Sequence, residues 1–174
     1  MRLIRVILLC TSALCAVRAT EPDISSFAGV QLENGFNISL YADDTQVANP
    51  VTICFDRQGN LYPVEAHRRL SGAWGVTMSR WWSMEDYAGK SLADREAMYA
   101  RWAHIVPPAR LTRDSDFLRK ISDADGDGRA DKSLLLLKFN GPLEGNAAGV
   151  LADDEGLIVA NAPNIWRVRS DGET

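Results

Sequence analysis

The chain contains little cysteine, and its cysteines are unevenly placed. Three occur in 174 residues, and two of them, Cys10 and Cys15, lie in the first apolar run. If that run is removed, Cys54 stands alone and an internal disulfide is excluded. Cys54 lies within VTICF. There we favour a small buried hydrophobic residue over a nucleophile.

Long hydrophobic runs are also scarce. The basic start MRLIR leads into VILLCTSALCAV and then VRA, which ends at Ala19. This order predicts a signal peptide at 1–19 and export to the periplasm or the extracellular space. A buried N-terminal helix is disfavoured by the polar TEPDISS that follows, and a lipoprotein anchor by Leu9 and Leu14 before the cysteines. The run of about twelve residues is too short to span a bilayer, and no later run is longer, so no transmembrane helix is expected.

The chain also lacks an excess of positive charge. Removal of Arg2, Arg5 and Arg18 with the signal reduces the 19 Lys and Arg to 16. Against 23 Asp and Glu, the remaining chain carries a formal charge of −7. Such a chain offers no basic stripe to replace the counterions of phosphates, which argues against nucleic acid as a partner. Glycine-rich phosphate loops, His/Cys zinc spacings and a recognisable Ser-His-Asp setting are missing too.

Strand patterns are present. FNISLYA (36–42) alternates apolar and polar residues, and NPVTICFD, the turn RQGN and LYPVEA then follow in order. This spacing is typical of an antiparallel meander. Pro63 inside LYPVEA predicts an edge strand or a bulge, because proline donates no hydrogen bond.

A helical segment interrupts these strands over about 83–106. Ser91 and Asp94 have the spacing of a capping box, and Pro107 and Pro108 end the segment. Four tryptophans cluster around it: Trp74, Trp81, Trp82 and Trp102. They are either an aromatic platform for a sugar or, as we favour, residues that pin the insertion onto the sheet.

One turn pattern occurs twice. Asp56 and Gly59 in VTICFDRQGNLYPVEA correspond to Asp153 and Gly156 in AGVLADDEGLIVANA, 97 residues later. Repeated meanders with an Asp-x-x-Gly hairpin predict an all-β fold with a helical insertion, namely about two blades of a partial β-propeller over 20–174. Because closure needs about 4–8 blades, we expect an N-terminal fragment of a longer protein. A complete β-sandwich is the alternative.

The order of four segments resembles a particular bacterial family. The segments are NPVTICFDRQGNLYPVEAHR, SMEDYAGKSLADREAMYARW, DADGDGRADK and AAGVLADDEGLIVANAPNIWRVR. They are similar to the N-terminal region of the secreted "membrane-bound dehydrogenase" type proteins of planctomycetes and verrucomicrobia. The resemblance implies a propeller like those of soluble glucose/sorbosone dehydrogenases, with a carbohydrate substrate. It also implies HEAT-type repeats and a c-type haem domain in the rest of the protein's own chain, so haem c or a quinone would lie beyond these residues.

The segment SDADGDGRAD predicts a metal site. Asp123, Asp125, Asp127, the carbonyl of Arg129 and Asp131 match the first nine positions of a calcium loop. Position twelve is Leu134 instead of glutamate, and the flanks are typical of strands. We therefore predict a structural calcium in a β-hairpin, with a solvated acidic turn as the alternative.

VEAHRR supplies the candidate catalytic residues. His67 is a possible general base for a sugar hydroxyl, with Arg68 or Arg69 holding an anionic quinone-type cofactor. The alternative is a surface histidine at a strand end. His104, near the end of the predicted helix, is given no catalytic role. Two hypotheses for function follow: a dehydrogenase-like oxidoreductase, and a calcium-stabilised binding or scaffold module without catalysis.

Overall fold

The computed structural model describes residues 29–69, 72–73 and 80–169. The chain divides into two compact units, Met1–Ser39 and Leu40–Thr174, and the helices and strands belong to the second. The predicted signal peptide, Trp74 and the SDGET segment lie outside the described residues. Among the residues that are described, no helix has the length and apolarity needed to cross a membrane.

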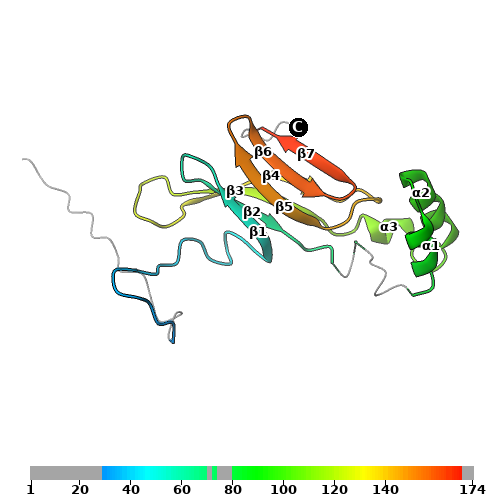
Figure 1. The fold of residues 1–174 in the computed structure, drawn as a ribbon, viewed down its shortest axis with the longest axis horizontal. Helices are drawn as coiled ribbons and strands as arrows, with labels where there is room; N and C mark the ends of the chain where they lie inside the picture. Colours follow the sequence, from blue (N-terminus) through cyan, green and yellow to red (C-terminus); the bar gives the residue numbers. More distant parts are fainter. Residues whose placement is uncertain (1–28, 70–71, 74–79, 170–174) are drawn as a thin grey trace, which may run out of the picture. The chain divides into compact units, whose positions relative to one another are not determined.

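Two antiparallel sheets make up most of the second unit (Figure 1). Sheet A has the order β1-β2-β3-β4 and sheet B the order β5-β6-β7. The strands of sheet A are β1 (Pro50–Phe55), β2 (Leu61–Glu65), β3 (Asp116–Ser122) and β4 (Lys132–Phe139). Those of sheet B are β5 (Ala147–Asp153), β6 (Gly156–Asn161) and β7 (Asn164–Val168). The two sheets confirm the all-β part of the fold prediction.

One hydrophobic core joins the two sheets. Sheet A contributes Tyr62, Val64, Leu118 and Phe139, and sheet B contributes Ala147, Leu157, Val159 and Val168. Burial of each large apolar side chain stabilises the fold by about 1.5–3 kcal/mol. All five residues of β2 are buried, which makes this strand the centre of the packing.

The Asp-x-x-Gly pattern forms the same kind of hairpin in both sheets. Asp56 Oδ1 accepts the backbone N–H groups of Gln58 and Asn60 between β1 and β2. Asp153 Oδ1 accepts the N–H of Glu155 between β5 and β6. Gly156 has a φ of 132°, and a Cβ there would lie 2.5 Å from the carbonyl oxygen of Val168, so only glycine fits.

Three helices lie between β2 and β3. They are α1 (Ser83–Ala88), α2 (Leu92–Arg101) and α3 (Pro108–Leu111). The predicted capping box is confirmed, since the Ser91 side chain accepts the N–H of Asp94 and donates to its carboxylate. A separate small core consists of Trp82, Met98, Val106 and Leu111. Trp82 therefore packs within the helical segment, whereas Trp81 is 44% exposed.

Two local predictions are wrong. The structure has no strand over 36–42, because the residues before β1 meet the sheet through single hydrogen bonds instead of a ladder. Ala130 donates to the carbonyl of Tyr41, for example, and Ala48 donates to the carboxylate of Glu65. Pro63 lies in β2, a central strand rather than an edge. Pro63 pairs with Ile53 of β1, and the register with β3 runs from Leu61–Ile121 to Val64–Leu118 on either side of it.

Candidate functional site

A buried carboxylate and a histidine meet at the end of β2. Glu65 is 1% exposed, and its Oε1 accepts the backbone N–H of Ala48 at 2.9 Å and the Arg119 Nε at 3.0 Å. Its other oxygen, Oε2, lies 3.4 Å from Nε2 of His67. The His67 side chain is 27% exposed and its ring contacts the edge of Phe117, with centroids 5.4 Å apart. We call Glu65, His67 and Arg119 the histidine cluster.

The backbone of His67 is held by a second buried carboxylate. Asp116, the first residue of β3, is fully buried. Its Oδ1 accepts the N–H groups of His67 and Arg68 at 2.7 and 2.8 Å, and its Oδ2 accepts the N–H of Ala147 at 2.9 Å. Asp116 thus fixes the chain after β2 to the start of β3 and to the start of β5.

Arg68, the other predicted catalytic residue, lies apart from this cluster. Its side chain is fully buried, with Nη2 donating to the carbonyls of Leu111 and Gly141 at 2.8 and 3.0 Å. Nη1 donates to the carbonyl of Gly145 at 3.2 Å. These bonds tie the helical segment to the chain between the two sheets. A catalytic role for Arg68 stays a prediction, and its surroundings are those of a structural residue.

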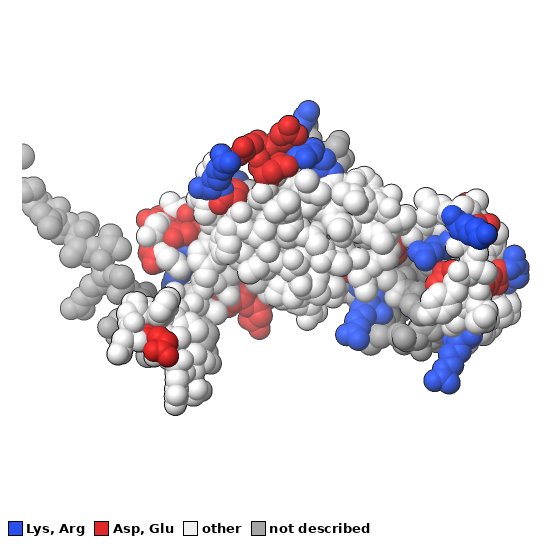
Figure 2. Space-filling view, in the orientation of Figure 1, with Lys and Arg blue, Asp and Glu red and all other residues white. Residues whose placement is uncertain are grey.

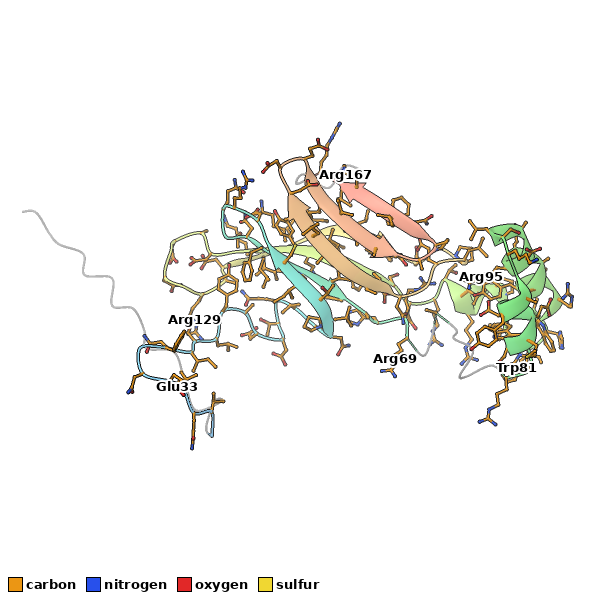
Figure 3. All side chains as sticks on the ribbon, viewed as in Figure 1. Glu33, Arg69, Trp81, Arg95, Arg129 and Arg167 are labelled. Carbon is orange, nitrogen blue, oxygen red and sulfur yellow. The ribbon has the colours of Figure 1, made fainter. Side chains whose placement is uncertain are left out.

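The cation beside His67 is instead Arg119, which the sequence analysis missed. The register places Phe117 opposite Glu65, and Arg119, two residues further along β3, lies on the same strand face and reaches the same carboxylate. The pairing of β2 with β3 that brings these residues together is not visible in the sequence. Arg69 is exposed and projects from the chain after β2 (Figure 3).

The histidine cluster has the elements of an oriented base. A histidine that contacts a buried carboxylate keeps one ring nitrogen fixed, so the ring is held in one orientation. Arg119 and the N–H of Ala48 keep that carboxylate in place. The geometry therefore allows His67 to accept a proton from a hydroxyl group.

The segment 123–131, which we call the aspartate loop, joins β3 to β4. Asp123 accepts N–H groups from Gly126 and Gly128, at 2.7 and 2.8 Å, where both glycines have positive φ. The N–H of Gly128, followed by that of Gly126, lowers the pKa of the Asp123 carboxyl below its usual value, against a smaller opposing effect of burial. The loop thus favours the charged form of Asp123.

Three of the five predicted calcium ligands come together in this loop. Carboxylate oxygens of Asp123, Asp125 and Asp131 lie within 4.8 Å of one another. Asp127 lies outside that group and accepts the N–H of Arg129 at 2.8 Å. Carboxylate oxygens at this spacing suit a hard cation such as Ca²⁺. Whether a metal binds stays a prediction.

Tyr41 lies against the same loop, and the sequence analysis did not link the two. Its carbonyl accepts the N–H of Ala130 at 2.8 Å. Its hydroxyl oxygen is buried, and in the part of the chain that the structure describes it makes no hydrogen bond. Burial, followed by the charge of Asp123, raises the pKa of the phenol.

A further cleft lies between the two Asp-x-x-Gly hairpins. It has a volume of about 520 Å³ and is lined by charged residues that include Arg57, Asp153 and Asp154. Arg57 forms an ion pair with Asp154 at 3.0 Å, and Arg167 donates three hydrogen bonds to Asp153. These charges already pair with one another, so the histidine cluster stays the candidate for reactive chemistry.

Comparison with known proteins places nearly the whole chain in one family. The model of a domain of unknown function (DUF7133) matches residues 23–173. The chain belongs to the DUF7133 family. No curated protein and no solved structure matches it. The DUF7133 match covers both sheets, the helical segment, the histidine cluster and the aspartate loop, but its description assigns no activity to any of them.

Proposed function

We propose that this DUF7133 chain forms the first blades of an exported β-propeller. The supporting observation is the repeat: two consecutive antiparallel sheets open with the same hairpin and share one core. The first strands of the two sheets, β1 and β5, lie side by side (Figure 1). Consecutive blades of a propeller have this relation, and the remaining blades would come from the rest of the protein's own chain.

The outer surface of sheet B also suits a propeller. Leu151 on β5 and Ile165 on β7 are 58% and 78% exposed. In Figure 2 the middle of this sheet is uncharged, and the charged atoms gather at the end where β5 turns into β6. An uncharged sheet face with exposed apolar side chains is typical of a surface that another layer covers. In a propeller, the next blade supplies that layer.

For activity, we propose a dehydrogenase-like oxidoreductase with a carbohydrate substrate. The observation that carries this proposal is the contact between His67 and the buried Glu65. His67 would take the proton of a sugar hydroxyl while a hydride leaves the carbon that bears this hydroxyl, so that a carbonyl group forms. The hydride would be accepted by a quinone-type cofactor, and electrons would pass to a haem c, both outside the residues described here.

The test uses the full-length protein, sugars and an artificial electron acceptor. We expect His67→Ala to lower kcat by about 10²–10⁴-fold, as loss of a general base does. His104→Ala is the control, since His104 lies after α2 and contacts the carbonyl of Arg101. Full activity in His67→Ala would remove His67 from the mechanism.

A second candidate function is a calcium-stabilised binding or scaffold module without catalysis. The close approach of Asp123, Asp125 and Asp131 favours it. Titration calorimetry of the 174-residue chain with Ca²⁺ should then show heat of binding, and the melting temperature should rise. The absence of both would eliminate the metal. Calcium binding without turnover of any sugar would favour this candidate over the oxidoreductase.

A further inference from the structure

Three residues near the start of β5 and the end of β6 carry buried polar atoms without hydrogen-bond partners among the described residues. In the described ranges, six buried side-chain N and O atoms lack a partner, and four of them belong to Arg68, Asn146 and Asn161. Asn161, the last residue of β6, is fully buried, and both atoms of its amide are among the four. Native proteins satisfy roughly 90% or more of such groups, either with protein atoms or with ordered water.

These three side chains are attached to segments that the structure brings together. Arg68 donates to the carbonyl of Gly145, which directly precedes Asn146. Ala147 is the register partner of Asn161 where β5 begins and β6 ends. The N–H of Gly145 also donates to the carbonyl of Ala162 at 2.6 Å. The junction between β5, β6 and Arg68 therefore contains both donors and acceptors that are not yet used.

The chemistry of these atoms selects a small neutral ligand. Arg68 Nε and the amide nitrogen of Asn161 are donors, whereas the amide oxygens of Asn146 and Asn161 are acceptors. A metal cation is disfavoured by the guanidinium of Arg68. An anion is disfavoured by the two amide oxygens and by Glu144, whose carboxylate lies 3.9 Å from Arg68. Water both donates and accepts, and buried waters commonly make about three hydrogen bonds to such groups.

Solvent can reach the surroundings of Arg68. A cleft of about 290 Å³ lies between β4 and β7, and its lining includes Gly141, Glu144 and Trp166. Gly141 accepts a hydrogen bond from Arg68, and Glu144 is its ion-pair partner. The indole N–H of Trp166 is another of the buried groups without a partner among the described residues.

We propose that ordered water molecules occupy this junction and that at least one is bound by the amide of Asn161. These waters act as part of the core: they satisfy Asn161, Asn146 and the Nε of Arg68, and they link the end of β6 to the start of β5. The site is independent of the proposed oxidoreductase activity.

Asn161→Leu tests the proposal by whether the melting temperature falls or rises. If water satisfies Asn161, leucine expels it and leaves the other polar groups unpaired, so the melting temperature should fall by about 3–8 °C. If the amide has no partner, leucine removes a buried orphan group and the melting temperature should stay constant or rise, which would overturn the proposal. Asn37→Leu is the matched control, because Asn37 is exposed and its replacement should shift the melting temperature by less than about 1 °C.

A second measurement decides the case in which Asn161→Leu fails to fold. It is a high-resolution crystal structure of the unmodified chain, from crystals grown without glycerol or sugar. Isolated spherical density within hydrogen-bond distance of the Asn161 amide is the expected result. Empty space there, or a protein group that bonds to the amide, would contradict the proposal.

Discussion

Two regions of the molecule hold aspartates by backbone N–H groups, but in opposite surroundings. Asp116 is fully buried, and its three donors come from segments up to 49 residues away. The aspartate loop is exposed, and its carboxylates accept N–H groups from at most seven residues away. The first arrangement uses a carboxylate to build tertiary structure. The second only shapes a loop and leaves carboxylate oxygens for a cation.

The largest effect on stability should come from Asp116. Asp116→Ala leaves the N–H groups of His67, Arg68 and Ala147 buried without a partner, which should cost on the order of 3–5 kcal/mol of unfolding free energy. Urea unfolding measures the loss. Asp44→Ala removes an exposed carboxylate and should change the free energy by less than about 0.5 kcal/mol. Equal losses of unfolding free energy in the two variants would contradict the structural role given to Asp116.

Replacement of Arg68 should have the next largest effect. Arg68→Met keeps much of the aliphatic volume but leaves three backbone carbonyls without their donor, so we expect a loss of about 2–4 kcal/mol. Arg69→Met, in the exposed neighbour, should stay within about 0.5 kcal/mol of the unmodified chain. If Arg68→Met retains its stability but loses turnover, Arg68 is catalytic, as the sequence analysis predicted.

Asp56 is intermediate in burial between Asp116 and the aspartate loop, and its carboxyl should make the stability depend on pH. Burial raises the pKa of its carboxyl, but the hydrogen bonds from Asn60, Tyr62 and Gln58 together outweigh burial and lower it. The carboxyl therefore stabilises the fold above its unfolded pKa of about 3.9, and this contribution is lost as pH falls through the lower folded pKa.

Unfolding in urea at pH values between 7 and 3 measures this contribution. Asp56→Asn should lose stability at pH 7 and show a flatter dependence below pH 4, because the titrating group is gone. Asp44→Asn is the control. If Asp56→Asn loses unfolding free energy at low pH as the unmodified chain does, another carboxyl causes the pH dependence.

When no calcium is present, substitutions in the aspartate loop should have the smallest effect on the melting temperature. Asp125→Asn and Asp127→Asn should each shift the melting temperature by less than about 2 °C, because both side chains are exposed. With calcium, Asp125→Asn should weaken binding in calorimetry more than Asp127→Asn, since only Asp125 belongs to the close group. Equal weakening by both variants would support the ligand set predicted from the sequence, in which Asp125 and Asp127 are both members.

The sequence predicted what depends on local chemistry. The two Asp-x-x-Gly hairpins, the cap at Ser91 and the strand-like flanks of the aspartate loop all follow from residues close in the chain. The sequence failed where a partner decides the structure. The residues 36–42 alternate like a strand but pair with no other strand. Pro63 lies in a central strand, where it has a register partner in β1, Ile53, and none in β3.

The candidate site was predicted only in part for the same reason. His67 was predicted from the sequence, whereas Glu65, two residues earlier, was given no role there. Arg119 and Asp116 are about fifty residues further on and reach the cluster only through the pairing of β2 with β3. Arg68 looked available for an anion because its charge is visible in the sequence, whereas the carbonyls of Leu111, Gly141 and Gly145 that surround it are not.

The hydrogen bonds of Asp116 to His67 and Arg68 have a consequence for how this chain can change length. They close the base of the segment between β2 and β3, so the two points where it leaves and rejoins sheet A are tied together directly. The closure entropy of such a segment grows only slowly with its length. Helices could therefore be added or removed between these points while the register of the strands is kept, which makes this the natural position for inserting a reporter domain.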